Sequence, residues 1–371
     1  MRAGELVNGY RLLEDFTVVG AGLSRWTFAE RDGRQYFLKE FLSPTYPDDD
    51  APGSPHTKAR KRARCATFEA HHRGIQEALA PISHAGGNLV VTLDFFRWGA
   101  KYYKVTDKID VAGLEPTEVA ALPLAGRLVL LKTVAHSLKI LHDRGIVHGD
   151  LKPSNVLIKR TEFGHTTKLI DFDSAYLAGS PPPPDEIVGT MNYYSPELVG
   201  YIQETGVTGD QLGTAADLFA LGMVYTEFLT GQMPVFDRER HRYASIAASA
   251  GEILRVPPGD VPDPARALVE RMLLVDPPAR PTIGEVHTEL LRIRTPDDVV
   301  ARPAAPPTEA ATPTEAASSR LRGRGLRISG PAIVPGVGPI AGPPGEGEEE
   351  PAREPSRLRG RLVDRRREPD S

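Results

Sequence analysis

The chain has 371 residues, of which 40% are hydrophobic and 25% are charged, and its formal net charge is −4. These values are typical of a soluble globular protein with one large or two ordinary domains, and the small charge gives no preference for nucleic acid or membrane. A single cysteine, Cys65, excludes an internal disulfide framework, and no apolar run predicts a signal peptide or a membrane span, so we expect a cytoplasmic protein.

The composition changes sharply near Thr295. Residues 295–371 contain 22 Pro or Gly, no aromatic residue and no Lys, and 12 acidic residues balance 12 basic ones. Such a segment cannot bury enough apolar surface to offset the entropy lost on ordering. We therefore predict a folded part over residues 1–294 and a disordered tail over residues 295–371.

The first part of the chain alternates between apolar and polar residues like a β-sheet. Residues 16–19, 26–29 and 35–41 predict three strands, with Asp32-Gly33 as a hairpin turn. Gly20, Ala21 and Gly22 form a Gly-x-Gly turn between the first two strands, where backbone N–H groups can approach a phosphate closely. By itself this motif is equally typical of a plain turn.

A polar insertion follows the third strand. Residues 43–64 are rich in Pro and Asp and end in a basic run over 58–64, which is either a docking patch or a solvated loop. Apolar spacing predicts a helix over residues 65–79, which Pro81 ends. Residues 88–96 and 101–109 predict two more strands, giving about five in all.

A second helical pattern, over residues 122–141, leads into a polar loop. Asp150, Lys152, Asn155 and Asp171 place two carboxylates, an ammonium and a carboxamide within 24 residues that begin at His148. Phosphoryl transfer uses such a set: an acid to orient a hydroxyl, a cation on the γ-phosphate, and oxygen ligands for Mg²⁺. Any one of these residues alone could cap a turn instead.

The spaced motifs resemble those of bacterial-type serine/threonine protein kinases, over residues 10–294. The matching segments are Gly20–Gly22, Lys39, the loop 148–155, Asp171-Phe172, the segment 189–197, Asp217 and the late motif 276–281. The resemblance implies an α+β bilobal fold. Its N-lobe (about residues 10–109) would contain a small antiparallel sheet, and its C-lobe (about residues 110–294) would be mainly helical.

The resemblance also implies roles. Asp150 would orient the substrate hydroxyl and accept its proton, Lys152 would neutralise the transferring phosphate, and Asn155 and Asp171 would hold Mg²⁺. Lys39 would contact the phosphates of ATP and pair with a helix glutamate, either Glu69 or Glu77. The remaining nucleotide-binding positions are Gly20, Ala21, Gly22, Thr106 as gatekeeper, Asp107, Ile109 and Leu157. Asp217 would cap the catalytic loop, and Arg280 would pair with Glu197.

Four positions depart from the family pattern. Gly149 replaces the arginine that clamps a phosphorylated activation loop, and Asp173 replaces the glycine of Asp-Phe-Gly. Arg25 replaces the third glycine of the phosphate loop, and Phe37 replaces a small adenine-pocket residue. These departures leave two alternatives to a serine/threonine protein kinase: a small-molecule phosphotransferase of the aminoglycoside type, and a pseudokinase scaffold.

Two short repeats mark the tail. Pro-Thr-Glu-Ala-Ala occurs at 307–311 and 313–317, and Ser-Arg-Leu-Arg-Gly-Arg occurs at 319–324 and 356–361. The repeats are either low-complexity drift or functional, with Thr308 and Thr314 phosphorylated and read by a phosphopeptide-binding partner.

Overall fold

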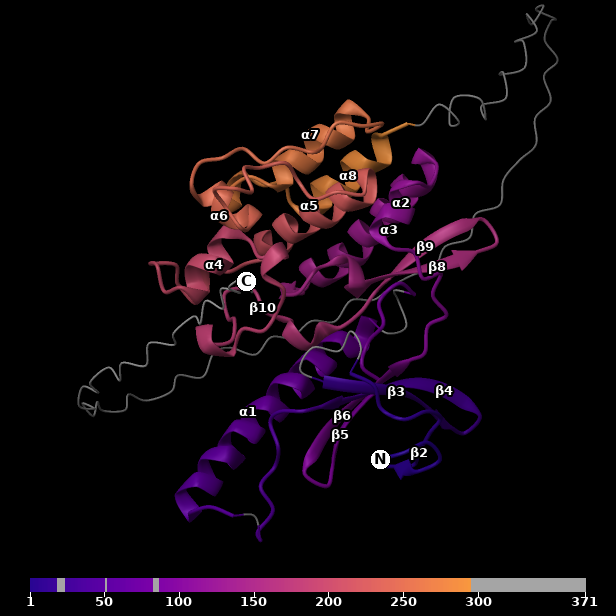
Figure 1. Ribbon diagram of the computed structural model, residues 1–371, viewed down its shortest axis with the longest axis vertical. Coiled ribbons are helices and arrows are strands. Elements are labelled where there is room, and N and C mark those ends of the chain that lie inside the picture. The colour runs from indigo at the N-terminus through magenta and orange to yellow at the C-terminus, as the bar shows by residue number, and fades with distance from the viewer. Residues whose placement is uncertain (19–23, 51, 83–86, 295–371) are drawn as a thin grey trace, which may run out of the picture. The chain divides into compact units, whose positions relative to one another are not determined.

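The computed structural model describes residues 1–18, 24–50, 52–82 and 87–294. They form an antiparallel sheet with one long helix beside it, the sheet lobe, and a mainly helical part, the helical lobe (Figure 1). The predicted α+β bilobal architecture is confirmed. The expected Gly20–Gly22 turn and the tail over 295–371 lie outside the described residues.

The sheet has six strands in the order β1-β2-β3-β4-β6-β5. The strands are β1 (Leu6–Val7), β2 (Tyr10–Leu12), β3 (Ser24–Arg31), β4 (Arg34–Phe41), β5 (Asp94–Trp98) and β6 (Lys101–Asp107). The β1–β2 hairpin was not predicted, although its Asn8-Gly9 turn, with positive φ at both residues, is a strong hairpin signal. The strand expected over 88–96 begins only at Asp94.

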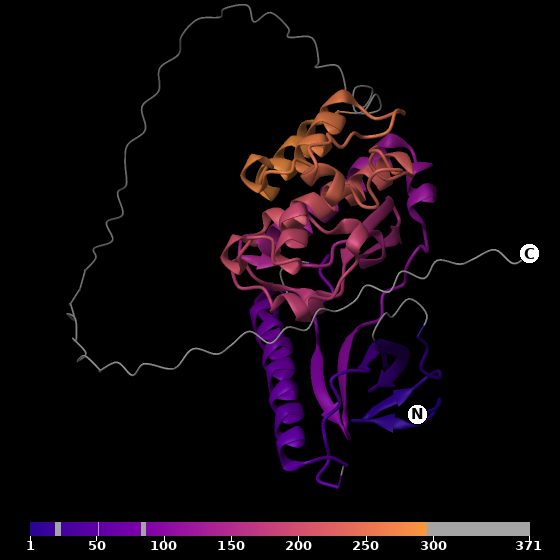
Figure 2. The same cartoon turned by 60° about the vertical axis from the view of Figure 1, so that its left-hand side comes forward.

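Helix α1 (Pro55–Leu79) packs along one face of the sheet, as Figure 2 shows. Cys65, Phe68 and His72 of α1 meet the aromatic rings of Phe41 and Phe95. The helix begins ten residues before the predicted start, because Pro55 at the first turn and the Ser54 side chain, which accepts a hydrogen bond from the Thr57 amide, start it there. The basic run 58–64 is therefore helical, and the prediction of a loop is wrong.

The helical lobe is built around a buried apolar core. Its helices are α2 (Pro116–Ala120), α3 (Leu124–His142), α4 (Pro196–Ile202), α5 (Ala215–Thr230), α6 (Ala244–Ser249), α7 (Asp263–Met272) and α8 (Ile283–Arg292). Thirteen of the sixteen residues of α5 are buried, so this helix lies inside the lobe. Among the described residues, no helix has the length and apolar character needed to cross a bilayer.

Two small two-stranded sheets flank the polar loop. They are β7 (Ile146–Val147) with β10 (Tyr176–Leu177), and the hairpin of β8 (Val156–Thr161) with β9 (Gly164–Leu169). The loop between β7 and β8 carries Asp150, Lys152 and Asn155, and Asp171 lies two residues after the end of β9. Backbone pairing thus brings the two polar segments to one place.

A buried ion pair anchors α4 to the chain after α7. The Arg280 guanidinium donates to both carboxylate oxygens of Glu197, at 2.7 and 2.8 Å, and also to the carbonyls of Leu274 and Ala215. The predicted Glu197–Arg280 pairing is confirmed. The Arg280 side chain is fully buried, so no solvent can replace the partner that a substitution removes.

We expect Arg280→Met to lower the free energy of unfolding by about 3–5 kcal/mol, because it leaves the Glu197 carboxylate buried without its cation. Arg271→Met is the control, since the Arg271–Glu289 pair is exposed and its loss costs less than about 1 kcal/mol. Urea-induced unfolding of both variants measures the difference. Equal losses in the two variants would contradict the structural role of Arg280.

Candidate active site

The catalytic-loop residues form a hydrogen-bonded set around Asp150. Lys152 Nζ donates to Asp150 Oδ2 at 2.6 Å, and Asn155 Nδ2 donates to the Asp150 backbone oxygen at 2.7 Å and to Oδ2 at 3.2 Å. Lys152 Nζ also donates to the Thr190 hydroxyl at 3.0 Å. The carboxylate of Asp150 is therefore held in one orientation, with a cation beside it.

The buried carboxylate of Asp217, in the first turn of α5, fixes the backbone of this loop. Its Oδ2 accepts from the His148 amide at 2.7 Å, and its Oδ1 accepts from the Gly149 amide at 3.1 Å. His142 Nε2 lies 2.9 Å from the same carboxylate. The predicted capping role of Asp217 is confirmed. His148 is also structural, because its ring contacts the Ile170 carbonyl at 3.0 Å and packs on Phe172.

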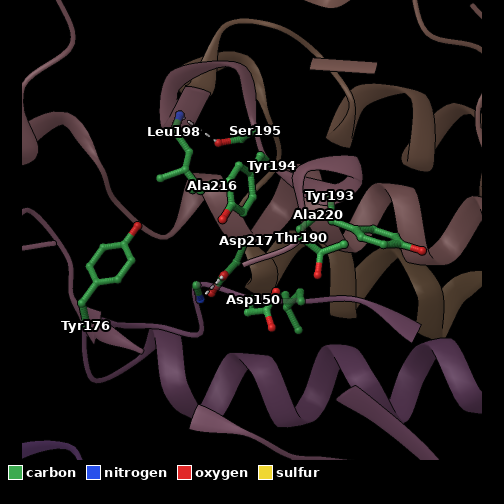
Figure 3. A pocket seen from close by; sticks show the side chains of 12 residues that line it. Asp150, Tyr176, Thr190, Tyr193, Tyr194, Ser195, Leu198, Ala216, Asp217 and Ala220 are labelled. Atoms are coloured by element: carbon green, nitrogen blue, oxygen red, sulfur yellow. Dashed lines mark hydrogen bonds between the residues drawn. The ribbon is translucent and has the colours of Figure 1, made fainter. Parts of the chain in front are cut away.

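A pocket lies against Asp150, between the catalytic loop and the segment before α4 (Figure 3). Thr190, Tyr193 and Tyr194 line it together with Asp150, whereas Lys39 and Asp171 do not. Burial and the nearby Asp150 charge raise the pKa of Tyr194 to about 12, so its hydroxyl keeps its proton at neutral pH. The Asp150 carboxylate is thus part of the lining of this pocket.

On the sheet, Lys39 of β4 contacts two carboxylates. Lys39 Nζ donates to Asp171 Oδ2 at 3.0 Å and to Asp173 Oδ2 at 2.7 Å. Burial by itself would lower the pKa of Lys39, but the charges of Asp173 and Asp171 outweigh it and raise that pKa, so the ammonium is charged. Lys104 on β6 completes the group, donating to Asp171 Oδ1 at 3.0 Å and to Asp173 Oδ1.

The expected pairing of Lys39 with a helix glutamate is wrong for this structure. Glu69 Oε1 instead accepts a hydrogen bond of 2.6 Å from the Tyr102 hydroxyl, and Glu77 is exposed. The side chain of α1 that faces the Asp173 carboxylate is His72, whose Nδ1 lies 3.9 Å from Asp173 Oδ1. Burial lowers the pKa of His72 to about 3, so the ring is neutral at neutral pH.

One face of the sheet, the nucleotide face, carries Lys39 and Thr106, two of the residues expected to bind nucleotide. In the antiparallel register, Phe37 is opposite Thr106 and Lys39 is opposite Lys104, so all four side chains lie on the same face. Phe37 stacks on Trp26, with ring centroids 5.4 Å apart. Phe37 therefore belongs to an aromatic surface on which a planar ring could stack.

The remaining predicted nucleotide-binding residues lie at the end of β6 and on β8. Asp107 is the last residue of β6 and forms an ion pair with Arg34, Ile109 comes two residues later, and Leu157 lies on β8. Arg25 does not reach the nucleotide face, because its guanidinium pairs with the buried Glu40 at 2.9 Å on the opposite face of the sheet. The departure at Arg25 thus stabilises the sheet.

The donor set fits Mg²⁺ that arrives with a nucleotide. Asn155 and Asp171 offer the hard oxygen ligands that this ion prefers, and the Asp171 side chain is 30% exposed. Among the described residues no group of three His, Cys, Asp or Glu could hold a metal without other ligands. The site therefore suits an ion that keeps waters and phosphate oxygens as its remaining ligands.

The model of the protein kinase domain family matches residues 77–291 of this chain. The chain belongs to the protein kinase domain family. Similar proteins include the serine/threonine-protein kinases ksg1 of Schizosaccharomyces pombe, PSK2 of Saccharomyces cerevisiae and pkn2 of Myxococcus xanthus. They are 32%, 30% and 32% identical over 42%, 54% and 36% of this chain. The matching part spans only 26%, 17% and 16% of those proteins.

Within this kinase domain, Gly149 is required by the backbone. Its φ is 78°, and a Cβ atom there would lie 2.3 Å from the backbone oxygen of Ser174. L-residues with side chains rarely adopt this φ, and the approaching atom is a backbone oxygen that no side-chain rotation can remove. The loop in this conformation has no room for an arginine side chain at position 149.

Lys104 is the site residue that sequence reasoning missed. One signal could have found it: Lys104 lies two residues before Thr106 on the same strand, so both must point to the nucleotide face. Its partner Asp173 was noted only as a replacement of the glycine in Asp-Phe-Gly, and no contact with a lysine was predicted.

We expect Gly149→Ala to destabilise the kinase domain more than Gly145→Ala. Gly145 has a similar φ of 67° but no atom within 4 Å of an added Cβ, so its substitution carries only the backbone cost of about 1–2 kcal/mol. Gly149→Ala adds the clash, a further ~1–3 kcal/mol. Urea-induced unfolding measures the free energy of unfolding of both variants. Equal losses would show that the backbone around the Ser174 carbonyl can shift to accommodate the added Cβ without further cost.

Proposed function

We propose that this protein transfers the γ-phosphoryl group of Mg-ATP to serine or threonine hydroxyls of protein substrates. The observation that carries this proposal is the Asp150 carboxylate, which Lys152 and Asn155 hold in one orientation where it lines the pocket of Figure 3. We expect the substrate hydroxyl to reach Asp150 from this pocket and the nucleotide phosphates to lie beside Lys39 and Asp171.

Each residue then has a physical task. Asp150 accepts a hydrogen bond from the attacking hydroxyl and takes its proton late in the transfer. Lys152 donates to the transferring phosphoryl oxygens, whose charge is greatest in the transition state. Lys39 orients the α- and β-phosphates. Asn155 and Asp171 would hold Mg²⁺, which when bound neutralises charge on the β- and γ-phosphates.

Two observations support a protein substrate over a small molecule. Lys152 contacts Thr190, so the segment that runs to α4 is packed directly against the catalytic loop. The start of α4 is in turn anchored by the buried Glu197–Arg280 pair. A rigid platform beside the reacting carboxylate suits an extended peptide chain, and the named serine/threonine kinases among the relatives favour the same substrate class.

We further propose that the enzyme acts without phosphorylation of its activation segment. Binding of such a phosphate by the catalytic loop would need an arginine at position 149. Glycine carries no charge there, and the backbone leaves no room for a side chain. Packing contacts hold the segment instead: the Ser174 hydroxyl donates to the Val188 carbonyl at 3.0 Å, and the Tyr201 hydroxyl donates to the Pro182 carbonyl at 3.0 Å.

Incubation of the purified protein with Mg-ATP, a generic protein substrate and an aminoglycoside tests the function. We expect phosphoprotein from the wild type and at least a ~100-fold loss of rate in Asp150→Asn, because the base is removed while the shape is kept. Asp171→Ala should abolish Mg²⁺-dependent turnover. Asp143→Asn, at an exposed ion pair of α3, is the control and should retain full activity.

The other outcomes identify the alternatives. Phosphorylated aminoglycoside without phosphoprotein would assign a small-molecule phosphotransferase. Absence of both products, together with absence of ATP binding, would assign a pseudokinase scaffold. Unchanged turnover in Asp171→Ala would overturn the assignment of the metal ligand.

For the tail we propose that Thr308 and Thr314 are autophosphorylated and recognised by a phosphopeptide-binding partner. Their support is the exact repetition of Pro-Thr-Glu-Ala-Ala around both threonines. Phosphosite mapping after incubation with Mg-ATP should find phosphate on these threonines in the wild type and none in Asp150→Asn. A tail that active enzyme leaves unmodified would contradict the proposal.

A further inference from the structure

Two lysines lie side by side on the nucleotide face of the sheet. Lys39 of β4 and Lys104 of β6 are directly opposite in the antiparallel register, and their side chains are only 14% and 6% exposed. Like charges at such positions repel each other, and burial removes the water that would screen them. This pair can persist only with negative charge held close to both ammonium groups.

Asp171 and Asp173 supply that charge. Each of the two carboxylates contacts both lysines, so four charged groups form a closed, neutral cluster. Asp171 adopts a left-handed backbone conformation with φ of 62°, and a short 3-10 turn over Phe172–Ser174 follows it. This local shape lets two carboxylates separated by one residue point to the same side, while Phe172 is buried below them.

Helix α1 supplies no carboxylate to the cluster within the described residues. Glu69 is bound to Tyr102, and the position that faces the cluster is the neutral His72. The helix contacts the loop through His71, whose Nε2 lies 3.0 Å from the Asp173 backbone oxygen. Lys39 is therefore held by residues of the loop after β9 and not by the helix beside it.

We propose that Asp173 is the positioning residue for Lys39 in this enzyme, and that Lys104 is the cation that allows a second buried carboxylate to stand beside Asp171. Only the expected effect on kcat rests on the proposed function; the contacts within the cluster do not. Once Asp171 is engaged by Mg²⁺ and nucleotide, Asp173 is the one carboxylate of the cluster left to orient Lys39. Positioning of Lys39 then depends on the conformation of this loop, whatever the position of helix α1.

The cluster itself is tested without nucleotide, by double-mutant cycles on the urea unfolding equilibrium. Lys39→Met combined with Asp173→Asn should deviate from additivity by about tenfold or more in the unfolding constant, since the two groups are in contact. The matched cycle of Lys39→Met with Glu69→Gln should be additive within about twofold. Coupling of Lys39 to Glu69 but not to Asp173 would overturn the proposal.

The effect of Asp173 on catalysis is tested by moving the carboxylate from position 173 to position 72 of α1. Lys104→Met/Asp173→Gly removes one charge of each sign and should lower kcat at least ~10-fold, because Mg²⁺ and nucleotide then engage Asp171, the one cluster carboxylate that remains beside Lys39. Adding His72→Glu to this background places a carboxylate on α1 next to the vacated position, and should recover most of kcat with KM for the protein substrate unchanged. His72→Gln in the same background is the uncharged control. Equal activity of the Glu and Gln versions would contradict a positioning role.

The two proposals can fail separately. If wild-type protein phosphorylates no substrate, the proposed function is wrong, and the unfolding cycles still decide whether Asp173 holds Lys39. If the wild type is active but Asp173→Asn keeps kcat within about twofold, the positioning role is wrong and the proposed function stands.

Discussion

Lys39 and Lys104 lie side by side on one face of the sheet, and the two carboxylates that neutralise them come from a loop of the other lobe. Because isolated buried charges are costly, the sheet and the loop after β9 hold each other in place. Asp171 and Asp173 thereby keep the end of β9 against the nucleotide face. The same contacts hold the proposed metal ligand Asp171 beside Lys39 and Lys104.

A second set of contacts keeps the catalytic loop in place from below. Asp217 binds two successive backbone amides of the loop, and the Glu197–Arg280 pair anchors α4 beside it. The amide of Gly149 is one of the two that Asp217 binds, and the conformation of this glycine excludes a side chain. Hydrogen bonds and the buried ion pair inside the fold therefore hold the catalytic loop and α4 in place.

Much of the site could be predicted because its residues are close in sequence or constrained by strand alternation. Asp150, Lys152, Asn155 and Asp171 lie within one loop–hairpin unit, so their proximity follows from local structure. The start of α1 was predicted wrongly, although Ser54 and Pro55 carry a capping signal, because the charged run 58–64 hides the apolar period by which helices are recognised. The β1–β2 hairpin was not predicted because its strands, of 2 and 3 residues, are too short to show an alternating pattern.

The sequence by itself predicted the protein kinase family and the groups proposed to carry the chemistry, since these depend on residue type and local spacing. Only the tertiary structure decided which counter-ion holds Lys39. Glu69, Glu77 and Asp173 are all carboxylates available in the sequence, and the choice among them depends on how α1 packs on the sheet and on the left-handed turn at Asp171. Long-range electrostatic pairing of this kind is set by three-dimensional distance, which spacing along one chain does not encode.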